Sequence, residues 1–239
     1  MFKQLLWKEL REQRWKLIFG MVMLLFFTGT LLAARITSGR EVLVVVWMIG
    51  GLVLALYSAM GVFAPETVNG THIFLTSKPI RPSKVFFGKW IVGWLGFAVP
   101  MCVCSSLLAL LILFHSQGRL FELKYIARGS FAGVALGTML YTMTCCFAPR
   151  KSGEAMVGFT GLILCVVFIL HIMFMMTITT IGRNQFSFAN EAVIYLNPLM
   201  WFNFISRMSS DMHLWLLVME QIVLFVLTIL YGYRRWRRG

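Results

Sequence analysis

Six apolar runs, each long enough to cross a bilayer as a helix, dominate this chain of 239 residues. A hydrocarbon core about 30 Å thick needs about 20 helical residues, because each residue advances the helix by about 1.5 Å. With 59% hydrophobic and 13% charged residues, the chain is too apolar for a soluble protein of this size. We therefore expect an all-α integral membrane protein with six spans, at about residues 17–34, 42–64, 90–114, 126–147, 155–181 and 214–233.

Lysine and arginine fall unevenly on the two sides of these spans. If the N-terminus is cytoplasmic, fifteen of the 22 cations lie in the inner segments, which are residues 1–16, 65–89, 148–154 and 234–239. This asymmetry predicts a multi-pass protein of the inner (plasma) membrane with both termini cytoplasmic. The net charge of +13 then suits anionic lipid headgroups, and we expect no nucleic-acid partner because no separate soluble domain carries it.

The first sixteen residues combine apolar and charged positions at helical spacing. Their apolar side falls at Phe2, Leu5, Leu6, Leu10 and Leu17, although Glu9 and Lys16 interrupt it. We expect an interfacial helix over residues 1–16 that lies along the inner leaflet, with Trp7 and Trp15 at headgroup depth. An ordinary charged tail is the alternative. A cleaved signal peptide fits less well, because its basic segment is shorter and its apolar run ends sooner.

Few polar residues lie within the predicted spans. His171 in the fifth span and Glu220 in the sixth fit either a transport pathway or an interhelical hydrogen bond. Gly129, Gly133 and Gly137 share one helix face, where a neighbouring backbone can approach closely. The five cysteines all lie in apolar runs without histidine or acid beside them, which predicts packing rather than metal binding. We expect one domain over residues 1–239, because no repeat or linker divides the chain.

Residues 65–89, between the second and third spans, form the most distinctive connection. Glu66 suits the first turn of a helix and Pro79 cannot continue one, so we expect a compact helix over residues 66–77. Its apolar residues have nothing large in the chain to cover them, which predicts docking to another protein; they are Ile73, Phe74 and Leu75.

This connection resembles the coupling helix of ABC-2 type permeases, the membrane subunits of a class of ABC transporters. The residues that match the family pattern, in order, are Glu66, Gly70, Thr71, Leu75, Pro79, Ile80, Gly88 and Lys89. Pro82 and Ser83 follow Arg81, where the family often has small or polar residues. The family also has an N-terminal interfacial helix, six spans and an Asn-Pro segment before the last span, matched here by Asn197 and Pro198. The resemblance therefore extends over essentially the whole chain.

The resemblance implies a type V exporter-like architecture in which the permease forms the pathway as a dimer. The coupling helix would dock into a separate ATP-binding subunit through Glu66, Gly70, Thr71, Phe74, Leu75, Pro79 and Arg81. Two ATP-binding subunits and a second permease, either another copy or a homologue, are the implied partners. The chain lacks the phosphate-binding Gly-x-x-x-x-Gly-Lys-Ser/Thr pattern, so ATP and Mg²⁺ belong to the partner and no enzyme activity is expected here.

The apolar connection before the last span, residues 182–213, predicts a re-entrant segment at the outer face. Asn197, Pro198 and Trp201 are candidates for an outer gate, and an interfacial helix resting on the outer leaflet is the alternative. For the whole chain, the alternative function is a non-transporting membrane scaffold or an immunity-type protein that binds a partner.

The cation asymmetry makes a testable topology prediction. Reporters fused after Gly239 and within residues 78–84 should both report a cytoplasmic location, and a reporter fused near residue 119 should report the opposite side. An external reporter at Gly239 would contradict the predicted number of spans.

Overall fold

Six α-helices make up the part of the chain that the computed structural model describes, which is residues 2–33, 50–63, 81–115, 120–148, 153–181 and 211–237. Every element in these ranges is helical, so the predicted all-α class is confirmed for them. The helices are α1 (Phe2–Ala33), α3 (Gly51–Met60), α6 (Pro82–His115), α7 (Leu120–Phe147), α8 (Glu154–Ile181) and α11 (Asp211–Arg237).

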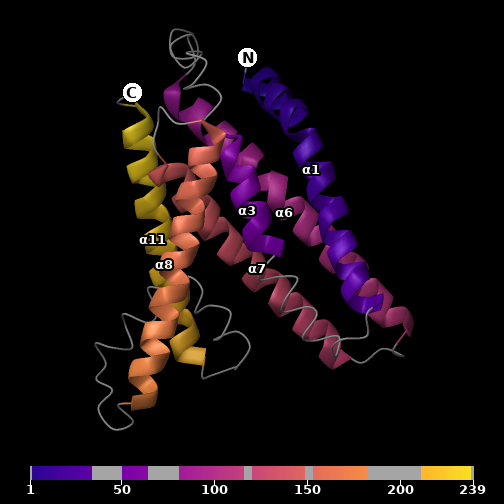
Figure 1. The fold of residues 1–239 in the computed structure, drawn as a ribbon. Coiled ribbons are helices and arrows are strands. Elements are labelled where there is room, and N and C mark those ends of the chain that lie inside the picture. The colour runs from indigo at the N-terminus through magenta and orange to yellow at the C-terminus, as the bar shows by residue number, and fades with distance from the viewer. Residues whose placement is uncertain are drawn as a thin grey trace.

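Helix α7 is the centre of the bundle, because α3, α6, α8 and α11 all pack against it. Helix α1 lies along α6 at the side away from α8 and α11 (Figure 1). The core where α1, α3, α6 and α7 meet includes Leu24, Ala55, Phe97 and Tyr141, each no more than 2% exposed. This core therefore joins helices that are far apart in the sequence.

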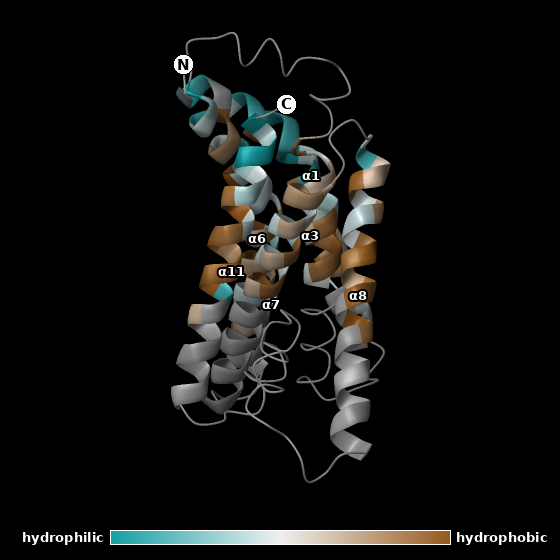
Figure 2. Cartoon of the chain, turned by 90° about the vertical axis from the view of Figure 1, so that its left-hand side faces the viewer, coloured by the Kyte–Doolittle hydropathy of each residue, from teal (hydrophilic) through white to brown (hydrophobic). Residues whose placement is uncertain are grey.

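Polar and apolar residues are separated along the length of the bundle. Figure 2 shows hydrophilic residues where α1 begins and α11 ends, and a predominantly hydrophobic band next to them along the helices. The first turns of α1 and the last turns of α11 lie at this same end (Figure 1). Away from this end, α8 turns large apolar side chains outward; they include Phe159, Leu162, Val166, Val167 and Leu170.

One helical segment in the described part of the chain, Pro82–Leu107 of α6, has both the length and the apolar character needed to cross a bilayer. Shorter apolar helical stretches occur at Gly51–Met60, Gly133–Phe147 and Glu154–Val167. The six-span arrangement accordingly stays a prediction.

Several helices extend past the predicted limits of the spans, and α1 and α6 do so by the most residues. Helix α1 continues without interruption from Phe2 to Ala33, so it joins the predicted interfacial helix and the first span. Its first half is rich in Leu, Lys, Gln, Glu and Arg, which favour helix, and it holds no proline. Helix α6 begins at Pro82, before the predicted span limit at Trp90, because proline fits the first position of a helix. The Arg81 carbonyl accepts hydrogen bonds from the amides of Lys84 and Val85 at this start.

A tight contact between α6 and α7 lies beside the core. The Tyr141 hydroxyl donates to the Trp90 carbonyl oxygen at 2.9 Å. Gly93, one turn further along α6, leaves the space that the Tyr141 ring and Val62 fill, so a methyl group there would collide with both. The hydrogen bond holds the Tyr141 ring in place, so the ring has little freedom to move aside.

Replacing Gly93 with alanine should destabilise the bundle. The expected loss is about 1–3 kcal/mol, because overpacking of a close contact forces rigid neighbours to shift. Thermal unfolding of the purified protein in detergent measures this loss. Gly153→Ala is the control, since a methyl group at Gly153 meets nothing within 4 Å. An equal melting temperature for the two variants would contradict the proposed rigidity of this contact.

Candidate functional site

The polar end of the bundle contains the candidate site, and its centre is the inward face of α1. Glu9, Gln13 and Lys16 are four and three residues apart, so they lie on one side of the helix. Gly20 and Leu24 continue the same side toward the apolar core, and both are buried. The face that packs on the bundle is therefore polar in its first half and apolar in its second.

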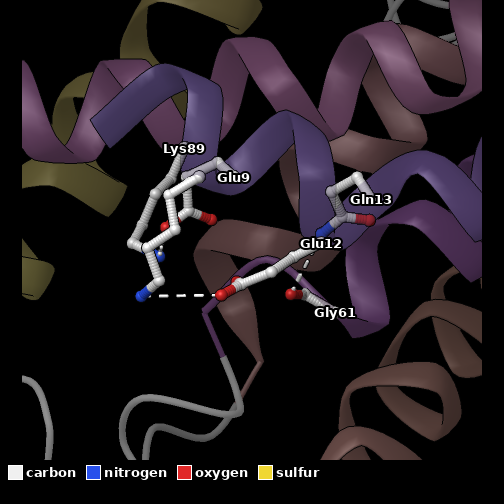
Figure 3. A network of polar contacts seen from close by, with 6 residues as sticks. Glu9, Glu12, Gln13, Gly61 and Lys89 are labelled. Atoms are coloured by element: carbon white, nitrogen blue, oxygen red, sulfur yellow. Dashed lines mark hydrogen bonds and ion pairs between the residues drawn. The ribbon is translucent and has the colours of Figure 1, made fainter. Parts of the chain in front are cut away.

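Glu9 and Lys89 form a buried ion pair between α1 and α6. The Lys89 Nζ atom donates to the Glu9 Oε1 atom at 2.8 Å, and the two side chains are only 3% and 6% exposed (Figure 3). Removing two charges from water is costly, so such a pair persists only where its geometry is good. The short distance meets this condition, and the pair fixes the position of α1 on α6.

Gln13 and Lys16 reach the end of α3. The Gln13 Nε2 atom donates to the carbonyl oxygen of Gly61 at 3.3 Å, and Gly61 is the residue at which α3 ends (Figure 3). The Lys16 ammonium lies 5.6 Å from the centre of the Tyr57 ring. Burial lowers the pKa of Lys16, and the nearby Glu154 carboxylate partly offsets this effect. One helix face thus contacts α3 and α6, and its Lys16 is within electrostatic range of Glu154 at the start of α8.

These contacts lie on both sides of residues 64–80 in the sequence. Gly61 belongs to the turn that ends α3, and Lys89 lies in the first turns of α6. Residues 64–80, which include most of the motif that resembles a coupling helix, connect these two points. The first half of α1 therefore holds the chain immediately before and shortly after that segment.

The outward face of the same half of α1 has a different character. Trp7 is 71% exposed and Trp15 is 66% exposed. The Arg14 guanidinium lies 5.4 Å from the centre of the Trp15 ring, and Lys8 pairs with Glu12 at 3.6 Å on the exposed surface. The outward face of this half of α1 thus combines two exposed tryptophans with charged side chains, while its inward face is also polar. Such a surface is typical of the headgroup region of a membrane.

Helix α11 completes the polar end. The Arg235 guanidinium donates to the Cys146 carbonyl oxygen at 2.9 Å and so caps the last turn of α7. Phe86 of α6 contacts the rings of Tyr233 and Trp236 of α11. Figure 2 shows hydrophilic residues at this end of the bundle. The basic residues of the adjoining segments are Lys3, Lys8, Arg11, Arg14 and Lys16 of α1, Arg81 immediately before α6, Lys84 and Lys89 of α6, and Arg234, Arg235 and Arg237 of α11.

Most of the residues predicted for the site from sequence fall outside the described part of the chain. Within residues 64–80 these are Glu66, Gly70, Thr71, Phe74, Leu75 and Pro79, and within residues 182–213 they are Asn197, Pro198 and Trp201. Arg81 is described, and it is exposed immediately before α6.

The remaining candidates lie within helices. His171 is in α8, Glu220 is in α11 and Gly129 is in α7, but their side-chain surroundings are outside the described positions. Gly137 of α7 lies against the Phe97 ring of α6. The carbonyl oxygen of Gly133 lies 3.7 Å from a Cβ atom placed on Gly51 of α3. The described contacts of this glycine face are therefore with helices of the same chain.

The sequence did contain a signal for the polar cluster. Glu9 and Lys16 interrupt the apolar stripe of residues 1–16, and both face the bundle in the structure. A charge that breaks a pattern in this way is a candidate for a buried partner of opposite sign. The partner itself, Lys89, is 80 residues further along the chain, so no local pattern identifies it.

Neutralising one member of the ion pair should cost more than neutralising both. Glu9→Gln leaves the buried Lys89 without the Glu9 carboxylate, and we expect a loss of about 3–5 kcal/mol in the free energy of unfolding. Lys89→Met should cost a similar amount, and the double variant Glu9→Gln/Lys89→Met should recover part of the loss. Unfolding of the four proteins in detergent gives the coupling energy between the two sites. Additive losses would show that the two charges do not interact.

The sequence was compared with known protein families and with curated proteins. The sequence matches no model of a known protein family and no curated protein.

Proposed function

We propose that this chain is the permease subunit of an ABC-2 type ATP-driven exporter. Two permeases, identical or homologous, would form the translocation pathway in the plasma membrane. Two separate ATP-binding subunits would bind ATP and Mg²⁺ and would supply the hydrolysis. Both termini and residues 64–80 would lie on the cytoplasmic side.

The observation that carries this proposal is the placement of the two helix ends on either side of the segment that resembles a coupling helix. Residues 64–80 join α3 to α6, and both connections lie at the polar end, next to the ends of α1 and α11. The contacts of Glu9 and Gln13 hold the residues on either side of the segment. A docking segment must be attached firmly to the helices that it moves, and this attachment meets that requirement.

The distribution of apolar surface agrees with a membrane location. Next to the basic end, α8 and α11 expose large apolar side chains; on α11 they include Met219, Ile222, Val223, Val226 and Leu227. Lipid tails or a second permease would cover such surfaces, whereas water would make them unfavourable. The exposed tryptophans of α1, Trp7 and Trp15, fit the headgroup layer between the basic end and the apolar band.

Loss of the two apolar anchors of the docking segment should release the ATP-binding subunit. Phe74→Asp/Leu75→Asp removes side chains whose burial would each contribute about 1.5–3 kcal/mol, and it adds two charges. Co-purification with a co-expressed ATP-binding cassette protein from a neighbouring gene measures docking. Permease-dependent ATP hydrolysis is the second readout, and the isolated permease should have none.

Thr76→Asp/Ser77→Asp is the matched control, because it adds the same charge to the same segment without removing an apolar side chain. This control should retain more of the bound ATPase than the Phe74/Leu75 variant. If the wild-type permease recovers no ATP-binding subunit, the chain fits the alternative of a non-transporting scaffold or immunity-type protein. If the Phe74/Leu75 variant still binds and activates the ATPase, residues 64–80 are not the docking site.

A further inference from the structure

The two contacts that border residues 64–80 come from neighbouring turns of one helix. Glu9 binds Lys89 on the α6 side, and Gln13 binds Gly61 on the α3 side. Residues four apart on a helix lie on the same face and are separated by about 6 Å along its axis. The separation of the two attachment points is therefore set by a single rigid turn of α1.

Both contacts lie where water and salt have little effect. Glu9 and Gln13 are 4% and 6% exposed, and Lys89 is 3% exposed. A buried pair is screened much less than a pair on the surface. Lys8 and Glu12, on the outward face of the same turns, form a pair whose side chains are 60% and 57% exposed. The same turns of α1 thus take part in two ion pairs, a buried one with α6 and an exposed one within α1, which can be compared directly.

Helix α1 also connects these contacts to the apolar part of the bundle. It continues unbroken to Ala33, and its Gly20 lies close to Pro100 of α6 and Leu54 of α3. A Cβ atom at Gly20 would lie 3.1 Å from the Leu54 side chain and 3.4 Å from Pro100. The close packing leaves α1 little room to slide, so its two halves move together.

We propose that the first half of α1 anchors both ends of the connection formed by residues 64–80. Gln13 anchors the end of α3, and Glu9 anchors the start of α6. This inference rests on the proposed function for one point, namely that residues 64–80 dock the ATP-binding subunit. Glu9 and Gln13 are positioning residues: they need not touch the partner, yet docking depends on them. A displacement of the docked segment then passes to α1 as well as to α3 and α6.

Hydrogen exchange of the purified permease alone tests this anchoring role of α1 without any partner. In Glu9→Gln, amides of residues 83–89 should exchange at least tenfold faster, because the buried Lys89 ammonium has lost the Glu9 carboxylate, and residues 57–63 should change less. In Gln13→Leu the order should be reversed, with residues 57–63 affected more than residues 83–89. Glu12→Gln makes the same charge change on the exposed face and should alter neither region.

The opposite order of the affected regions in the two variants distinguishes local anchoring by α1 from a general loss of stability. Uniformly faster exchange in both variants, or exchange equal to that of Glu12→Gln, would overturn the proposal. A second arm measures co-purification with the ATP-binding subunit, which Glu9→Gln and Gln13→Leu should both reduce, whereas Glu12→Gln should not. Full retention of the subunit by both variants would also overturn it. If even the wild type recovers no ATP-binding subunit, the proposed function fails, and the exchange pattern still decides whether α1 holds the segment.

Discussion

The buried pair of Glu9 and Lys89 is the constraint on which the polar end of the bundle depends. A buried charge without a partner is so unfavourable that α1 has essentially one acceptable register on α6. Sliding α1 by four residues would separate the 2.8 Å contact and place Leu5 or Gln13, neither of which carries a charge, near Lys89. The same register brings Gln13 to the end of α3 and Gly20 to Pro100. A single electrostatic requirement thus aligns the polar and apolar contacts of α1.

The amino-acid pattern predicts helices well where apolar runs are long and bounded by clear signals. Residues 155–181 were expected to be a span, and α8 covers Glu154–Ile181. Its first turn carries a glutamate, which suits the positive end of a helix dipole. The limit between residues 16 and 17 was less predictable, because a change from polar to apolar composition does not break a helix. The backbone of α1 stays helical through residues 16 and 17.

The contacts of the candidate site are harder to obtain from sequence. Glu9, Gln13 and Lys16 have partners that lie far along the chain, at Lys89, Gly61 and Tyr57. Periodicity describes one helix at a time and holds no information about which helix will pack beside it. Local sequence therefore indicates a segment that resembles a coupling helix by its residue order, whereas the contacts of α1 with the residues on both sides of that segment follow only from the packing.

The distance between Glu9 and Lys89 along the chain also affects how the protein is made. Synthesis proceeds from the N-terminus, so Glu9 leaves the ribosome 80 residues before Lys89 does. During that interval the first half of α1 cannot bury its carboxylate, and it must remain in contact with water. In the proposed membrane arrangement, its tryptophans and arginines suit the headgroup region during this interval. The nascent chain thus has a natural order of assembly, in which α1 closes onto the bundle only after the start of α6 has emerged.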